Sequence, residues 1–137
     1  MVEDIKRRQY PPIPQEAEIT GKTILDAAFK IHTALGPGLL ESVYEACLAY
    51  EIRRSGVLVD TQVHLPVLYE NVKVDAGLRM DMLVGKCVIV EIKSIEKVNP
   101  LHEAQLLTYL KLSGIRVGYL INFNTLRLKE GIRRIVR

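Results

Sequence analysis

The chain has 137 residues and a formal net charge of +3, and it is 48% hydrophobic and 26% charged, which is typical of one globular domain. No apolar run reaches the ~18 residues that span a bilayer, and the polar N-terminus lacks the apolar core of a secretory signal. We therefore expect a cytoplasmic protein that does not enter a membrane. The two cysteines, Cys47 and Cys87, belong to no Cys/His cluster, so neither a zinc site nor a disulfide framework is indicated.

The N-terminal residues 1–18 are predicted to form an extended arm, because Pro11, Pro12 and Pro14 disfavour a helix there. The remaining residues, 19–137, are predicted to form a single domain. Basic residues cluster near both ends of the chain and would suit phosphate groups, although a solvated face explains them equally well.

Three helices are predicted from apolar spacing and from breakers. The first runs from Thr20 to about Leu35 and stops at Gly36-Pro37-Gly38. The second runs from about Leu39 to Ser55. The third starts at Asn99-Pro100, with proline early in its first turn, and stops near Ser113-Gly114.

Between the second and third helices the apolar period changes to two, which predicts strands. We expect them to form an antiparallel meander, and these strands cover residues 57–59, 62–68, 72–74, 78–84 and 87–93. If Gly85-Lys86 is the loop of the last hairpin, residue 84 pairs with residue 87, and Asp81 lies opposite Val90, one register step from Glu91. Further strands are predicted after the third helix, at residues 117–122, 126–128 and 132–136.

Three charged residues, Asp81, Glu91 and Lys93, interrupt strands that are otherwise apolar. Glu91 and Lys93 are two residues apart and therefore project from the same face. Burying such charges is costly unless they are paired or bound to a metal. A magnesium-dependent phosphodiesterase needs hard oxygen ligands and a positive charge beside the phosphate. We interpret Asp81 and Glu91 as metal ligands, Lys93 as a catalytic residue, and the backbone carbonyl of Ile92 as a third oxygen ligand.

Helical residues would complete this site. Glu41, near the start of the second helix, is a candidate third acid, and the alternative is a first-turn acid that interacts with the helix dipole. Gln105 and Tyr109 are four residues apart on one face of the third helix, where they would position a substrate. The alternative is an ordinary amphipathic helix. His102 is expected to be a helix-start residue.

The ordered set of an acid on a helix, Gly77-x-x-x-Asp81, Glu91-x-Lys93 and Gln105-x-x-x-Tyr109 resembles the PD-(D/E)XK nuclease superfamily. Within it, Gly38-Leu39-Leu40-Glu41-Ser42-Val43-Tyr44 resembles the GxxExxY family, and the likeness extends from about Ile24 to the C-terminus. The resemblance implies an α/β (α+β) fold with a restriction-endonuclease-like core, in which a central mixed β-sheet is flanked by α-helices. It also places Glu41, Asp81, Glu91 and Lys93 at the positions of nuclease active-site residues, followed by Gln105.

The leading functional hypothesis is therefore a metal-dependent nuclease that hydrolyses phosphodiester bonds of DNA or RNA. Its cofactor would be Mg²⁺ or Mn²⁺, held by Asp81, Glu91 and Glu41, and its partners would be nucleic acid and a second subunit in a homodimer. The alternative is a non-catalytic, nuclease-like module that binds nucleic acid or a partner protein. A third hypothesis, an acid/base enzyme that uses Glu91 and Lys93 on a small molecule, has no phosphate loop or dinucleotide fingerprint to support it.

Overall fold

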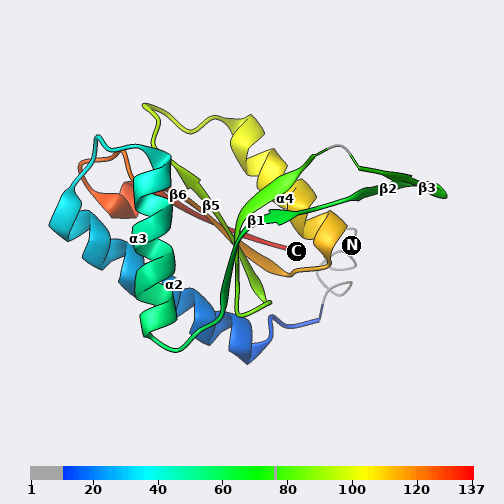
Figure 1. Ribbon diagram of the computed structural model, residues 1–137, viewed down its shortest axis with the longest axis horizontal. Coiled ribbons are helices and arrows are strands. Elements are labelled where there is room, and N and C mark those ends of the chain that lie inside the picture. Colours follow the sequence, from blue (N-terminus) through cyan, green and yellow to red (C-terminus); the bar gives the residue numbers. More distant parts are fainter. Residues whose placement is uncertain (1–10, 76) are drawn as a thin grey trace, which may run out of the picture.

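The computed structural model describes residues 11–75 and 77–137. Three α-helices, seven β-strands and one short 3₁₀ helix make up this part of the chain (Figure 1). In chain order they are α2 (Gln15–Leu35), α3 (Glu41–Arg54), β1 (Val59–His64), β2 (Val67–Tyr69), β3 (Val72–Val74), β4 (Arg79–Val84), β5 (Val88–Lys93), α4 (Pro100–Ser113), β6 (Val117–Asn122), η1 (Leu128–Gly131) and β7 (Ile132–Val136).

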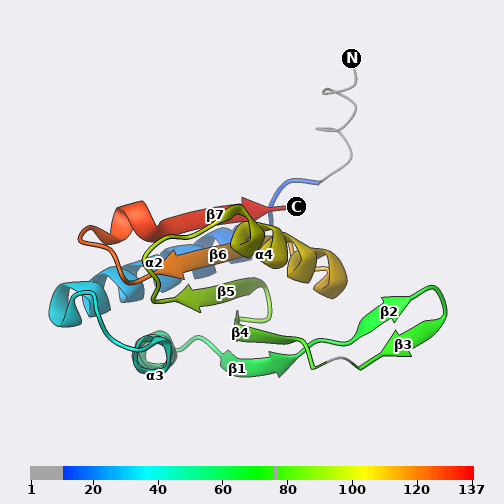
Figure 2. The same cartoon turned by 90° about the horizontal axis from the view of Figure 1, so that it is seen from above.

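Five strands form a twisted mixed sheet in the order β1-β4-β5-β6-β7, and Figure 2 shows them stacked in this order. The β5–β6 pair is parallel, because α4 connects these two strands as a crossover. The other neighbours, β1–β4, β4–β5 and β6–β7, are antiparallel. This architecture confirms the predicted α+β fold, with a mixed sheet between helices.

The helices cover opposite faces of the sheet. One apolar cluster joins α2 and α3 to sheet residues such as Met82, Val90 and Ile121. A second cluster joins α4 to the opposite face, through residues such as Ile89 and Leu120. Because β5 and β6 are buried on both faces, their sequences are almost continuously apolar.

The predicted antiparallel meander is correct for β1, β4 and β5, which are neighbours in the main sheet, but not for β2 and β3. Strands β2 and β3 pair with each other as a separate two-stranded sheet, and β4 lies directly beside β1. Figures 1 and 2 show this β2–β3 hairpin extending away from the body of the molecule. The chain leaves the main sheet after β1, forms the hairpin and returns at β4. Strands β1 and β4 therefore pair directly, although the hairpin separates them in sequence.

The predicted arm and the predicted strand at residues 126–128 both need correction. Within the arm, residues 1–10 lie outside the described part of the chain, but residues 15–18 are helical, because α2 begins at Gln15. The prolines precede that helix, and the Pro14 carbonyl accepts its first hydrogen bond, from the Ala17 N–H at 3.0 Å. Residues 126–128 form no strand. The chain folds back tightly after β6, where Gly131 lies against the Asn122 carbonyl, so a 3₁₀ turn forms instead.

Among the helices of residues 11–75 and 77–137, none combines the length and the apolar character required to cross a bilayer.

Candidate active site

The acidic pair lies where two strands of the central sheet stop pairing. The β4–β5 register runs from Val84↔Val88 to Met82↔Val90 and goes no further, so Asp81 and Glu91 follow the last pair. Beyond that point the side chains replace the backbone ladder. The Asp81 N–H donates to Glu91 Oε1 at 3.2 Å, and the Ile92 N–H donates to Asp81 Oδ2 at 2.8 Å. The Glu91 carboxylate therefore holds the backbone of β4, and the Asp81 carboxylate holds the backbone of β5.

The register corrects the sequence-based prediction by one residue. The hairpin loop contains Cys87 as well as Gly85 and Lys86, because Val84 pairs with Val88. Gly85 and Lys86 both have positive φ, 57° and 56°, and the Cys87 N–H donates to the Val84 carbonyl at 3.1 Å. The extra loop residue moves Glu91 from one step away to the position level with Asp81.

A backbone distortion accompanies this opening. Met80 packs in the cluster beneath α4, whereas Met82, two residues later, packs in the cluster on the opposite face. Regular strands keep residues i and i+2 on one face, so β4 changes face at Asp81. The neighbouring β1 is distorted at the same level, where Gln62 has a φ of 51°. The sheet thus bends where the two acids meet.

Burial strongly perturbs one of the two acids. The Glu91 residue is only 5% exposed. Desolvation, reinforced by the nearby Asp81 carboxylate, raises the pKa of Glu91 to about 9, although the Asp81 N–H and the Lys93 ammonium oppose the shift. Without a cation, Glu91 therefore carries a proton at neutral pH. A buried acid in this state accommodates a cation well, because a positive charge compensates the lost hydration of its carboxylate.

Lys93 lies at the end of β5, two residues after Glu91, and is half-buried. It pairs with Asn122 in the parallel β5–β6 register. Among the described residues it forms no ion pair within 4 Å, so its ammonium is available to an anion brought to the acidic pair.

Glu41 is the first residue of α3 and reaches the same end of β5. Its Oε1 accepts a hydrogen bond from the Ser94 N–H at 3.3 Å. Glu41 is exposed and does not join the close contact between Asp81 and Glu91. In the described part of the chain, no group of three or more His, Cys, Asp or Glu residues lies close enough to hold a metal ion. The structure thus brings two of the three predicted acidic ligands together and places the third beside Ser94.

The two predicted residues of α4 differ in exposure. Tyr109 is 5% exposed. Burial is the main reason why the pKa of Tyr109 is raised, and the negative charges of Glu91 and Asp81 raise it further. The Tyr109 hydroxyl is therefore close enough to the acidic pair to feel its charge. Gln105 is exposed, one helical turn earlier.

His102 has a structural role at the start of α4. Its Nδ1 accepts from the Asn99 N–H at 3.1 Å, while Asn99 Oδ1 accepts from the Leu101 N–H at 2.9 Å. This reciprocal arrangement caps the helix. His102 is therefore a helix-start residue, as the sequence predicted.

Three residues around the site were given no site role by the sequence analysis. Asn122 is 2% exposed and binds the backbone of Ile95 through both ends of its amide, at 3.1 and 2.9 Å. Ser94 and Tyr44 bind the loop that precedes Glu41. Asn122 does leave a sequence signal, a polar residue at the end of an apolar strand. Tyr44 also leaves a signal, because it closes the Gly38–Tyr44 match, whereas Ser94 leaves none.

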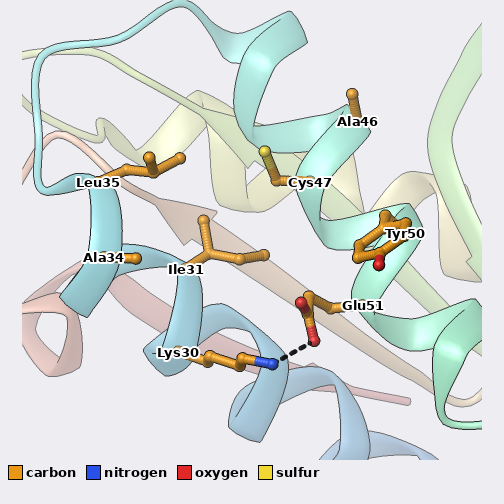
Figure 3. A pocket seen from close by; sticks show the side chains of 8 residues that line it. All are labelled: Lys30, Ile31, Ala34, Leu35, Ala46, Cys47, Tyr50 and Glu51. Carbon is orange, nitrogen blue, oxygen red and sulfur yellow. Dashed lines mark hydrogen bonds and ion pairs between the residues drawn. The ribbon is translucent and has the colours of Figure 1, made fainter.

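A pocket of about 370 Å³ lies elsewhere, between α2 and α3 (Figure 3). Apolar side chains such as Ile31 and Cys47 line much of it, and its charged pair, Lys30 and Glu51, is joined at 3.0 Å. Its lining among the described residues includes none of the predicted site residues, and the carboxylate of Glu51 is already paired with Lys30. The acidic pair is therefore the better candidate for chemistry.

The acidic pair fits a divalent cation by the chemistry of its donors. Two carboxylates within reach of one another, one of them desolvated, supply the hard oxygen ligands that Mg²⁺ prefers. Magnesium usually keeps several waters and takes only one or two carboxylates from the protein. A site with two carboxylates, such as Asp81 and Glu91, would match this preference, although the described residues hold no close group of three metal-ligating side chains.

Comparison with known proteins places the chain in a family. No curated protein and no solved structure matches the chain. A family model of the PD-(D/E)XK nuclease superfamily matches residues 18–135, which is most of the chain and includes every residue of the candidate site. The mixed five-stranded sheet between helices is consistent with the restriction-endonuclease-like fold of that superfamily. The chain belongs to the PD-(D/E)XK nuclease superfamily.

Proposed function

We propose that this protein is a nuclease that uses a divalent metal ion, Mg²⁺ or Mn²⁺, to hydrolyse phosphodiester bonds in DNA or RNA. The observation that carries the proposal is the pair of carboxylates at the opened end of β4 and β5, with Lys93 two residues after Glu91, where its charge acts to lower the pKa of Glu91. Nucleases of this superfamily generally use divalent metals. The match at Gly38–Tyr44 supports a place within the GxxExxY family.

Asp81 and Glu91 would hold the cation, with the backbone carbonyl of Ile92 as a further oxygen. The cation would supply positive charge to the phosphate and lower the pKa of the attacking water. Asp81 is already fixed by its bond to the Ile92 N–H at 2.8 Å, so this ligand needs little reorganisation. Glu91 would give up its proton to hold the cation.

Lys93 would neutralise charge that develops on the phosphate during attack, and its half-buried position strengthens this interaction. Glu41, at the same end of β5, would orient the attacking water. Gln105 and Tyr109 would position the nucleic acid from α4. We also predict a homodimer, which would meet both strands of a duplex. A cytoplasmic location is a further prediction.

The test is a cleavage assay with plasmid, single-stranded DNA and RNA in magnesium or manganese. We expect cleavage by the wild type and a loss of roughly 100- to 1,000-fold in Lys93→Ala, because one charge-stabilising group is removed. Lys97→Ala is the matched control, since Lys97 is an exposed lysine four residues later. Equal rates in the two variants would contradict the role of Lys93.

Absence of cleavage on all substrates, with nucleic-acid binding retained, would support the non-catalytic alternative instead. That alternative is compatible with the described residues, which hold no close group of three metal-ligating side chains, whereas Mg²⁺ can be held by two carboxylates.

A further inference from the structure

We infer that Tyr44 is a positioning residue of the proposed active site, which orients Glu41 relative to Lys93. This inference rests on the proposed function. Tyr44 lies one turn after Glu41 in α3, is fully buried, and touches neither Asp81 nor Glu91 through any hydrogen bond of the described residues.

The Tyr44 hydroxyl clamps the loop that carries Glu41. It donates to the Gly36 carbonyl at 2.6 Å and accepts from the Leu39 N–H at 3.1 Å. One buried oxygen therefore joins both ends of the turn between α2 and α3. Because Gly36 and Gly38 have positive φ values of 68° and 98°, this turn has a conformation that few residues adopt.

Few other contacts within residues 11–75 and 77–137 fix the start of α3. Its N-cap residue, Leu40, has no side chain that accepts a hydrogen bond, and Leu40 is 72% exposed. A helix start without a capping side chain frays readily. The orientation of Glu41, the next residue, therefore depends on the contacts of Tyr44 and Ser94.

Ser94 connects the same loop to the end of β5. Its hydroxyl donates to the Leu39 carbonyl at 2.5 Å, and its N–H donates to Glu41 Oε1 at 3.3 Å. Leu39 is thus held on one side by Ser94 and on the other by Tyr44.

The aromatic ring of Tyr44 completes a second connection. It stacks on Phe123, with ring centroids 4.4 Å apart and an interplanar angle of 6°. The Phe123 N–H donates to the Lys93 carbonyl at 2.9 Å. The hydroxyl of Tyr44 thus holds the Glu41 loop, while its ring packs on the residue bound to Lys93. A single side chain links the helix that carries the acid to the strand that carries the lysine.

This arrangement explains the spacing of Gly38-x-x-Glu41-x-x-Tyr44. Residues three apart in a helix lie on neighbouring positions of one face, so Tyr44 can reach back over the first turn to the loop. The glycine permits the turn, the glutamate faces Ser94, and the tyrosine holds both in place.

The test compares Tyr44→Phe with Tyr50→Phe. Tyr50 lies on the same helix but lines the α2–α3 pocket (Figure 3), and it is 61% exposed. We expect Tyr44→Phe to lower kcat by roughly 10- to 100-fold with little change in KM, because a misplaced catalytic group slows the chemical step. Tyr50→Phe should cleave at the wild-type rate.

Two further measurements separate positioning from a merely structural role. The double variant Tyr44→Phe/Glu41→Gln should be no slower than Glu41→Gln alone, since Tyr44 acts through Glu41. The amide resonance of Ser94 should shift in Tyr44→Phe and stay unchanged in Tyr50→Phe. Multiplicative kinetic effects of the two substitutions, or an unchanged Ser94 resonance, would overturn the inference.

If the wild type cleaves nothing, the proposed function has failed, and the Ser94 resonance alone decides whether Tyr44 positions Glu41. Should Tyr44→Phe fold poorly, Ser94→Ala removes the other hydroxyl bond to the loop, the one to the Leu39 carbonyl. A rate in Ser94→Ala equal to that of the wild type would then count against the inference.

Discussion

Glu91 combines two properties that oppose each other in the protein without a metal ion. Its burial favours the neutral form, whereas cation binding requires the charged form. Asp81 beside it adds to the cost of ionisation. A residue of this kind lowers the stability of the fold at neutral and alkaline pH, which is common where function and stability conflict.

We predict that the metal-free protein loses stability as the pH rises toward 9, and that Glu91→Gln removes this loss. The pKa of Glu91 is about 9 in the folded chain, against its ordinary value of 4.5 in an unfolded chain. Between these pH values the folded state binds a proton that the unfolded state does not, so the free energy of unfolding falls by up to about 1.4 kcal/mol per pH unit. Urea denaturation in EDTA at pH 6, 7, 8 and 9 measures this slope.

The matched control is Glu96→Gln, which removes a carboxylate from an exposed position five residues later. It should keep the wild-type slope. Parallel profiles for Glu91→Gln and the wild type would show that Glu91 is already ionised in the folded chain.

The same proton predicts the thermodynamics of cation binding. At pH 7 a cation held by Glu91 must displace about one proton, because the carboxyl is neutral beforehand. Titration calorimetry with Mg²⁺ or Mn²⁺ in buffers of different ionisation enthalpy measures this number directly. Binding without proton release would place the cation elsewhere, and Glu91→Gln should bind far more weakly.

At the scale of the elements, the β4–β5 hairpin sets the relation between the two acids. Its three-residue loop brings Glu91 level with Asp81, and a loop one residue shorter would turn the strand so that Glu91 faced the opposite side. Lys86 destabilises the backbone of this loop, since its φ of 56° is unfavourable for a residue with a Cβ.

We therefore predict that Lys86→Gly raises the free energy of unfolding by about 0.5 to 1 kcal/mol, because glycine adopts positive φ without steric strain and its greater flexibility in the unfolded chain offsets only part of this gain. Gly85→Ala, at a φ of 57°, should lower it. Urea denaturation at one pH compares the three proteins. A destabilised Lys86→Gly would show that the lysine side chain makes a stabilising contact that outweighs its backbone strain.

At the scale of the whole molecule, the sequence predicted the helices and strands well where one period dominates. Strands β5 and β6 and helix α4 lie within one residue of their predicted bounds. The pairing of strands was harder to predict, because a hairpin inserted between β1 and β4 leaves no mark on the apolar period. The register differed by one residue because Cys87 fits equally well in a loop or a strand.

For the candidate site, the sequence predicted residues whose chemistry is unusual for their surroundings. Asp81 and Glu91 are charged residues in apolar strands, and such a conflict is visible without coordinates. The contacts of Ser94 and Asn122 could not be predicted, because a hydrogen bond between residues 41 and 94 or between residues 95 and 122 depends on the packed sheet. The lack of a close three-acid group in the described residues could not be predicted either, because the position of α3 is set by its packing.

The whole fold should report cation binding and cleavage as separable properties. A ligand that binds only the folded state stabilises it, by about 2.7 kcal/mol at a concentration of 100 times its Kd. We therefore expect Mg²⁺ or Mn²⁺ to raise the Tm of the wild type. In Lys93→Ala the rise should be equal or larger, because a positive charge near the cation is removed, although cleavage is lost. In Glu91→Gln both the rise and cleavage should be lost. Thermal melts with and without EDTA measure this, and equal shifts in Glu91→Gln and the wild type would place the cation away from the acidic pair.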